Sequence, residues 1–258
     1  MYRTLFVLGF RRWSAYGAAA LGATFTNCTF GLIRSAVMLA VVGTAGGTLA
    51  GYDRATTATY VWLGQALIGP VHVFAWSELA QRIRSGDIAV DLARPVDPTL
   101  AYLAADLGRA AFSVLPRGVP PLLAGALITG LALPHSPAPY ALGALSLALA
   151  TAVSFACRWL VNLSAFWLLD LRGPMTLYLV LSGVLCGLVV PVRWFPHWLA
   201  VVAAATPFPS LLQAPIDVLT GRAGLQTVLT QALWLVLLLV LGRAVFALGA
   251  RKLVVQGG

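Results

Sequence analysis

Ionisable side chains are scarce in this sequence. Only 10% of its 258 residues are charged, whereas soluble domains carry roughly 25%. Hydrophobic residues make up 60% of the chain. This imbalance is too large for a soluble core and indicates that most of the surface faces lipid. The apolar runs are long and continuous rather than alternating, which favours membrane-spanning helices over barrel strands.

Lysine is almost absent. The one lysine, Lys252, is followed by Leu253, so the chain has no GxxxxGK[ST] loop, whose lysine contacts the β- and γ-phosphates of ATP. HExxH and GxSxG motifs are also missing. The three cysteines are far apart and show no metal-binding spacing with each other or with histidine; they are Cys28, Cys157 and Cys186. We therefore expect no catalytic residue, no metal site and no cofactor bound by this chain, and we expect that it is not an enzyme.

Acidic residues are few, and the sequence places them outside the expected spans. Asp53, Asp170 and Asp217 lie close to span ends, and the others fall in one polar stretch, residues 78–117. Proton-coupled carriers usually have acids or histidines inside their spans, so this pattern disfavours a carrier. The net charge of +9 does not indicate nucleic-acid binding, because the arginines lie scattered at the ends of apolar runs and form no basic stripe.

Charged and proline-rich stretches divide the chain into six candidate spans. Pro134, Pro137 and Pro139 mark the turn between the third and fourth. Residues 194–216 are also uncharged, but four prolines interrupt them, so we interpret them as broken, re-entrant helices at the membrane surface, with a seventh span as the alternative. The spans lie within residues 14–50, 55–77, the two halves of 118–169, 173–192 and 223–242.

The basic residues indicate the orientation of the six spans. With the N-terminus inside, 13 of the 17 Lys and Arg residues fall in cytoplasmic segments, and only Arg54, Arg193 and Arg222 fall outside. The expected fold is an all-α integral membrane protein, N-in and C-in, that forms one domain over residues 1–258. Residues 1–13 are predicted to form an interfacial amphipathic helix, because their apolar stretch is short and has no signal-peptide cleavage site.

The polar stretch 78–117 would then be a cytoplasmic loop. Residues 78–84 are expected to extend the second span as a helix. Gly86 then permits a left-handed cap, and Asp87 can cap a short amphipathic helix at residues 88–92. A short helix held between two breaks is suited to docking another protein; a plain solvated connection is the alternative.

Three segments of the chain, in order, resemble the permeases of the ABC-2 family. The first is RIRSGDIAVDLARPVDP, residues 82–98, which is similar to the cytoplasmic loop of the six-span group. The second runs from Phe166-Trp167 to Pro207-Phe208 and the third is APIDVLTG, residues 214–221. The chain departs from the family in one place, because Gly17 follows Tyr16 where an arginine is frequent.

The resemblance implies a type V exporter-like permease fold and a role in ATP-driven export across the cytoplasmic membrane of a bacterium. Two permeases, identical or paralogous, would lie side by side in the lipid, above two separate ATPase subunits that bind ATP and Mg. The loop would hold the coupling helix that meets the ATPase. The resemblance assigns residues that either form this contact or brace it: Ile83, Arg84, Ser85, Gly86, Asp87, Leu92, Arg94 and Pro95.

The resemblance also implies that the external segment, residues 193–222, closes the exit. Its expected gate residues are Pro191, Phe195, Pro196 and Pro207. Arg34 lies in the first span and is a candidate for the pathway or the permease interface. It would pair inside the protein or face a cavity, or else extend to the cytoplasmic interface. Several other polar or small residues would line a pathway or the contact between permeases, or simply join helices within the chain: Trp62, Gln65, Asn162, Tyr178, Ser182 and Gly183.

Two other functions stay open at this point. One is a membrane scaffold or assembly subunit without transport activity. The other is a secondary carrier driven by an ion gradient, which would still transport its substrate when every ATPase is removed.

Overall fold

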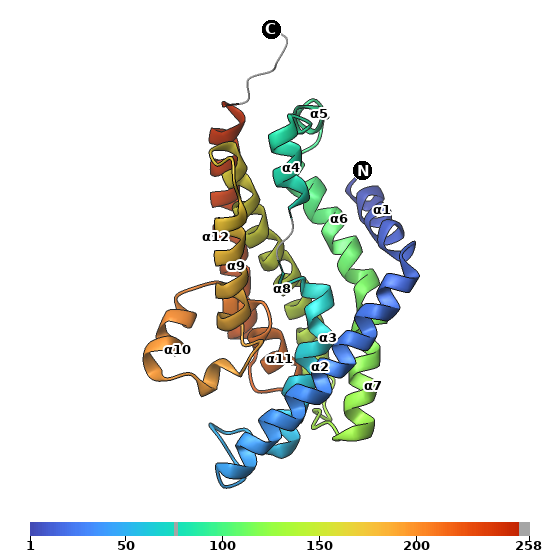
Figure 1. The fold of residues 1–258 in the computed structure, drawn as a ribbon, viewed down its shortest axis with the longest axis vertical. Coiled ribbons are helices and arrows are strands. Elements are labelled where there is room, and N and C mark those ends of the chain that lie inside the picture. Colours follow the sequence, from blue (N-terminus) through green and yellow to red (C-terminus); the bar gives the residue numbers. More distant parts are fainter. Residues whose placement is uncertain (75–76, 253–258) are drawn as a thin grey trace.

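The chain folds into an elongated bundle of helices (Figure 1). The computed structural model describes residues 1–74 and 77–252. Within these ranges the only β structure is an isolated bridge between Leu49 and Tyr52. The elements are α1 (Tyr2–Ser14), α2 (Gly17–Thr44), α3 (Arg54–Val71), α4 (Glu78–Ser85), α5 (Ile88–Leu92), α6 (Pro98–Ser113), η1 (Val114–Gly118), α7 (Val119–Ile128), α8 (Ala138–Leu163), η2 (Ser164–Phe166), α9 (Arg172–Leu185), η3 (Val192–Trp194), α10 (His197–Ala204), η4 (Phe208–Ser210), α11 (Gln213–Leu219) and α12 (Leu225–Ala250).

Four helices in the described part of the chain are long and apolar enough to cross a membrane. Each has at least 26 residues, which at 1.5 Å per residue is roughly 39 Å, more than the ~30 Å hydrocarbon core of a bilayer. The chain is therefore an all-α, multi-pass membrane protein. The four segments are Ala19–Thr44, Pro98–Ile128, Ala138–Phe166 and Leu225–Ala250.

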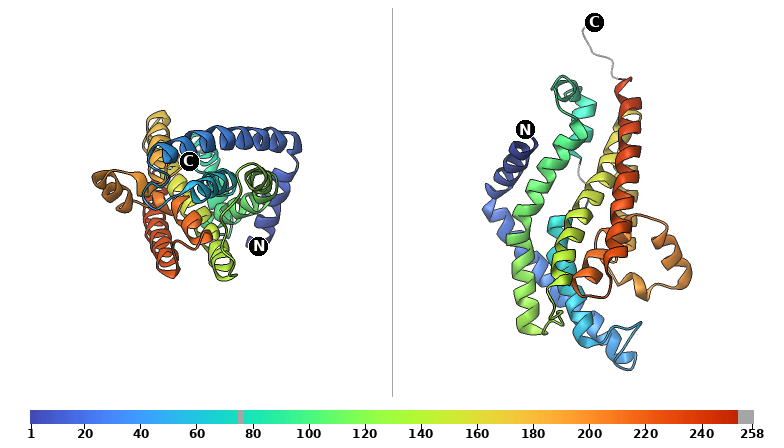
Figure 2. Two further views of the ribbon diagram at one scale, coloured as in Figure 1. Left: turned by 90° about the horizontal axis from the view of Figure 1, so that it is seen from below. Right: turned by 180° about the vertical axis from the view of Figure 1, so that it is seen from behind.

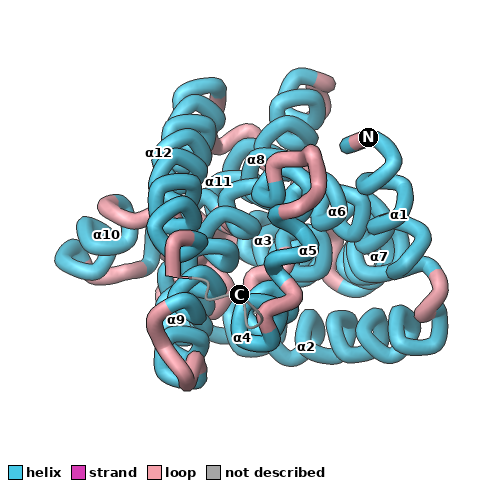
Figure 3. Tube along the Cα trace, turned by 90° about the horizontal axis from the view of Figure 1, so that it is seen from above, coloured by secondary structure: helices cyan, strands magenta, loops and turns pink. Residues whose placement is uncertain are grey.

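The second and fifth predicted spans contain helices of a different kind. Most residues of α3 are buried by the rest of the chain, so α3 contacts protein and needs no apolar outer face. Figure 3 shows α3 in the middle of the bundle, with α1, α6 and α7 on one side and α9, α10 and α12 on the other. α9 has 14 residues and reaches only about 21 Å. Residues 75–76 of the second predicted span lie outside the described part.

Local sequence sets both ends of α3. At its start Asp53 and Thr56 form a capping box, and the hydrogen bonds that Thr56 donates lower the pKa of Asp53 below its usual value. At its end Pro70 lies in the last turn, and His72 adopts a left-handed conformation with φ of 56°. The helix therefore stops at Val71, and the expectation that residues 78–84 extend the second span is wrong.

The third candidate span begins well before the uncharged region of the sequence. Asp97 caps α6, and the chain then stays helical from Pro98 to Ile128. Pro116 lies in the π-helical turn η1, which keeps the helix continuous across a residue that has no N–H to donate. Of the predicted loop 78–117, only residues 78–97 connect two long helices. The rest belongs to a candidate span.

This boundary changes the position of Asp106, which was expected in a water-facing loop. The carboxylate instead lies between α6 and α8, with only 11% of the side chain exposed. It pairs with Arg109 Nε at 2.7 Å and with an Arg158 guanidinium nitrogen at 2.8 Å. Arg109 also donates to the carbonyl oxygens of Gly69 and Pro70 at 2.9 and 3.0 Å. The expectation that no acid lies within a span is therefore wrong for Asp106, whose partner Arg158 comes from a distant part of the sequence.

The two ends of the bundle differ in what they present. α1, the α4–α5 segment and the last turns of α12 lie at one end, while the α2–α3 and α7–α8 connections lie at the other (Figures 1 and 2). Both ends of the described chain are thus on the same side as residues 78–97. This arrangement agrees with an even number of crossings.

α1 packs directly on α6 through two glycines. A Cβ atom at Gly9 would overlap the carbonyl oxygen of Ala105, and one at Gly108 would overlap that of Phe6. The two backbones therefore touch, which no other residue type allows. α1 is held to the bundle at this crossing.

The proline-rich segment 194–216 consists of short helical pieces. α10 is the longest, with eight residues, and η4 and α11 follow it. Eight residues span about 12 Å, so none of these helices is long enough to cross a bilayer alone. The segment is broken into short helices, as its prolines predicted.

Candidate functional site

The candidate site is the connection between α3 and α6, residues 78–97, which we call the connecting loop. Gly86 ends α4 with φ of 83°, as expected for a left-handed cap. Asp87 precedes α5, but its side chain makes no capping hydrogen bond. Its carboxylate instead accepts a hydrogen bond from Ser85 Oγ at 2.6 Å, across the turn. The local break was predicted correctly, and the mechanism proposed for Asp87 was wrong.

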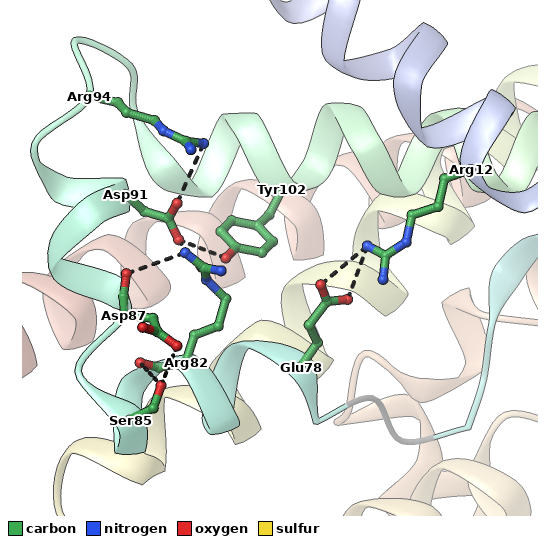
Figure 4. A network of polar contacts seen from close by, with 8 residues as sticks. All are labelled: Arg12, Glu78, Arg82, Ser85, Asp87, Asp91, Arg94 and Tyr102. Carbon is green, nitrogen blue, oxygen red and sulfur yellow. Dashed lines mark hydrogen bonds and ion pairs between the residues drawn. The ribbon is translucent and has the colours of Figure 1, made fainter.

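Asp91 holds the connecting loop together (Figure 4). One carboxylate oxygen pairs with Arg82 Nε at 2.9 Å and accepts a hydrogen bond from the Tyr102 hydroxyl, also at 2.9 Å. The other oxygen lies 3.6 Å from Arg94. Because Arg82 is on α4 and Tyr102 on α6, one carboxylate joins three consecutive elements. Only 10% of the Asp91 side chain is exposed, whereas its partners Arg82 and Arg94 are 32% and 62% exposed.

Apolar residues fasten the inner face of the connecting loop to the bundle. Leu79, Ile83 and Ile88 are buried against an aromatic cluster of α8 that includes Phe155 and Trp159. Ile83 therefore packs within its own chain. Its expected contribution to an ATPase contact is limited to supporting the loop from beneath.

The opposite face of the connecting loop is open. A cavity of about 800 Å³ separates the α4–α5 turn from residues 165–169. Two apolar side chains, Val90 and Leu92, are 55% and 40% exposed. The other exposed residues of the connecting loop include Arg84, Ser85, Gly86, Asp87, Arg94 and Pro95. Seven of the eight residues assigned to coupling are thus exposed, and Ile83 is the exception. Arg84, Ser85, Gly86 and Asp87 line this cavity, whereas Arg94 lines a separate one beside Arg82 and Asp91.

Asn162, expected on a pathway or between helices, lies beneath α4. Its side-chain oxygen accepts a hydrogen bond from the backbone N–H of Ala80 at 3.0 Å, and its amide nitrogen donates to the carbonyl of Arg158 at 2.7 Å. Asn162 therefore joins the start of the connecting loop to α8.

Sequence reasoning missed Arg82, Asp91 and Tyr102. The available signal was an acid within an amphipathic helix of five residues, flanked by arginines on both sides. What could not be read from the sequence is that Tyr102 lies on a different helix and turns toward that acid. Its position depends on how α6 packs against α4 and α5.

Most of the other predicted pathway residues are buried in helix contacts. Trp62 packs against Gly31 and Gly125 and donates to Thr129 Oγ1 at 3.0 Å. Gln65 and Tyr178 are almost fully buried, and so is Ser182, whose hydroxyl donates to the Val73 carbonyl at 3.4 Å. Gly183 is half-buried, with no neighbouring atom within 4 Å of a Cβ placed there. These contacts fit the alternative in which the residues join helices.

Arg34 pairs inside the protein, as one of its two alternatives expected. Its guanidinium donates to the carbonyl oxygen of Leu188 and, at 3.3 Å, to that of Val189. These carbonyls follow the end of α9 and have no helical partner, so Arg34 connects α2 to the segment after α9.

Three of the four predicted gate residues begin short helices. Pro191, Pro196 and Pro207 occupy the positions just before η3, α10 and η4. Proline fits there because its fixed φ suits a helix start and it has no N–H to leave unpaired. Phe195 ends η3 and is half-buried.

Gln213 joins this proline-rich segment to α3, and the sequence analysis did not single it out. Its side-chain oxygen accepts hydrogen bonds from the Tyr60 hydroxyl at 2.9 Å and from the Val192 backbone N–H at 2.8 Å. Its amide nitrogen donates to the Tyr52 hydroxyl at 3.4 Å. Gln213, Tyr52 and Tyr60 are all buried.

Replacing Gln213 tests how much its hydrogen bonds stabilise the fold. We expect Gln213→Leu to lower the free energy of unfolding by about 3 kcal/mol, because buried groups are left without a partner. Thermal unfolding of the purified chain in detergent measures this. Gln226→Leu, at an exposed position of α12, is the matched control. Equal stability of the two variants would contradict the assignment.

The fold and the connecting loop together define a class: a multi-pass membrane protein that presents a braced, exposed loop at the end where residues 1 and 252 lie. A family model described as ABC-2 family transporter protein matches residues 31–257. The chain therefore belongs to the ABC-2 transporter family, and this membership implies association with an ABC ATPase. A comparison with curated proteins gave no match.

Proposed function

We propose that the chain is the permease subunit of an ATP-binding-cassette exporter in the cytoplasmic membrane of a bacterium. Six crossings, N-in and C-in, would place the connecting loop in the cytoplasm. α3 would cross inside the protein, and α9 would cross together with the segment that follows it. A second permease, identical or paralogous, would complete the pathway. Two ATPase subunits would bind ATP and Mg, and this chain would hydrolyse none.

The observation that carries this proposal is the two-sided construction of the connecting loop. Ile83, Ile88 and the Asp91 contacts fasten the loop to the bundle, while Val90 and Leu92 of α5 stay exposed. A solvated connection would need neither the buried carboxylate nor the apolar anchor. Exposed apolar side chains on a braced support are typical of a protein-docking surface.

The same contacts would transmit a movement of the connecting loop to the membrane-spanning helices. Asp91 connects the loop to α6 through Tyr102, and Asn162 connects it to α8. If an ATPase displaced the loop, α6 and α8 would therefore move with it, because these contacts keep the loop from bending independently. Closure of the two ATPases on ATP would bias the relative positions of the permeases between two states.

Co-purification tests the docking surface. We expect the double variant Val90→Ser/Leu92→Ser to retain about tenfold less ATPase partner in mild detergent, because each serine removes apolar area that the contact would bury. The matched control is Val201→Ser/Val202→Ser on α10. These side chains are 54% and 46% exposed, and α10 lies away from the connecting loop.

Two results would contradict the proposal. One is equal ATPase recovery with both double variants. The other is transport by the chain in proteoliposomes that contain no ATPase, which would point to a secondary carrier. A scaffold subunit would instead bind its partners and show no ATP-dependent transport.

A further inference from the structure

A second cavity lies apart from the connecting loop's exposed face, between α1, α4, α6 and α8. Its volume is about 180 Å³. At one side it is bordered by Arg12 and Glu78, which form an ion pair at 3.2 Å with side chains 65% and 43% exposed (Figure 4). At the other side it reaches the buried Arg109 and Arg158 and their partner Asp106, whose side chain is 11% exposed. The cavity therefore leads from a water-exposed pair to a buried charged cluster.

The charges that line this cavity do not balance. Asp106 is shared between Arg109 and Arg158, which are 4% and 1% exposed. With Arg12 and Glu78 included, three arginines face two carboxylates, so one positive charge is in excess. Buried charge without a counter-charge is costly. An anion in the cavity would offset that cost.

Two further features suit a bound anion. His72 also lines the cavity, and its Nδ1 is buried without a hydrogen-bond partner in the described part of the protein. The Arg12–Glu78 pair is exposed, and such pairs contribute little stability. An incoming anion could therefore replace Glu78 on Arg12 at small cost.

The remaining walls of the cavity are partly apolar and aromatic. They include Trp13, Tyr102 and Phe155. The space is adequate for a phosphate-sized group but not for a lipid chain. A headgroup held here would have its apolar tail outside the cavity, along the membrane face beside α1.

We propose that this cavity binds the anionic headgroup of an amphiphile in the cytoplasmic leaflet. Basic pockets between helices on the cytoplasmic side are suited to anionic lipid headgroups. The inference rests on the proposed function for the orientation of α1. Arg12 lies outside the residues that the family model matches, so the site is assigned from the geometry of this chain.

Lipid binding to the full-length chain tests the inference. Native mass spectrometry in a zwitterionic detergent would count bound phosphatidylglycerol and phosphatidylcholine in separate titrations. We expect the former to bind more tightly. Arg12→Gln should weaken its binding about fivefold, as for one basic residue near an anionic headgroup. Glu78→Gln should strengthen it, because that variant removes a competing carboxylate.

Arg11→Gln is the matched control, since Arg11 is an exposed neighbour on α1 that does not line the cavity. Its binding should stay within about twofold of the unmodified chain, less than the effect of one basic residue at the site. Equal binding of the two lipids, equal effects of Arg11→Gln and Arg12→Gln, or no effect of Glu78→Gln would each overturn the proposal. All three side chains are exposed, so we expect the variants to fold like the unmodified chain.

Two further measurements identify the source of the headgroup. Competition by inorganic phosphate would support recognition of the anion itself. In proteoliposomes with the ATPase, ATP-driven movement of fluorescent phosphatidylglycerol between leaflets would support a transported amphiphile, and binding without movement would support a resident lipid. Binding is measured without ATP, so the absence of an ATPase partner would contradict the proposed function and leave this result standing.

Discussion

Asp91→Asn is expected to abolish most ATP-driven transport while the chain still inserts into the membrane. The substitution removes the charge that holds Arg82 and Arg94 and weakens the contact with Tyr102. Loss of one partner of a fully buried ion pair costs about 3–5 kcal/mol. The two arginine side chains are 32% and 62% exposed here, so water screens part of the interaction. We expect about 2–3 kcal/mol, which lowers the population of the ordered loop by roughly 30- to 150-fold.

Transport in proteoliposomes and hydrogen exchange of the loop amides measure the two consequences together. Asp170→Asn is the control, because Asp170 is also paired with an arginine, Arg172, but that pair is exposed. It should transport normally. If Asp91→Asn transports at the control rate, or if transport is lost without faster exchange in residues 78–97, Asp91 does not brace the loop.

Gly108→Leu is expected to release α1 from the bundle. The new side chain would overlap the carbonyl oxygen of Phe6 and the backbone nitrogen of Phe10. Overpacking costs about 1–3 kcal/mol where side chains can move aside. A backbone cannot, so we expect α1 to separate at a cost above about 3 kcal/mol and its amides to exchange more than roughly 100 times faster.

The control for this variant is Gly22→Leu. Gly22 lies on α2 with no atom within 4 Å of a Cβ placed there, so exchange in residues 2–14 should stay unchanged. Separation of α1 would also break the Arg12–Glu78 pair and open the cavity beside it. Unchanged protection of α1 in Gly108→Leu would show that the helix is not held at the glycine crossing.

The segments that the sequence predicted best are those governed by local chemistry. Gly86 ends α4 because its backbone adopts a left-handed conformation, and three of the four gate residues begin helices because they are prolines. The breaks around residues 134–139 and 194–216 follow from the same residue types. For these positions the neighbours in sequence contain the necessary information.

The sequence predicted less well the features that depend on how the helices pack against one another. Asp106 was assigned to a water-facing loop because Arg109 and Arg117 follow it, and charge density in a sequence normally marks exposure. In the fold, Arg158 approaches from α8 and neutralises the carboxylate. Ile83 was expected either to meet the ATPase or to brace that contact, and its packing on α8 favours the bracing role. Neither outcome is encoded in the local pattern.

The sequence by itself determined that this is a helical membrane protein without an ATP-binding loop, because composition and the single lysine require no knowledge of packing. It also located the helix breaks at Gly86 and in the proline-rich stretches, although not the end of α3 at Val71. Only the tertiary structure decided that the connecting loop is braced by Asp91, that α1 touches α6 at two glycines, and that three arginines gather around two carboxylates. These features join residues from separate helices, and their energies depend on burial, which arises only when the helices pack.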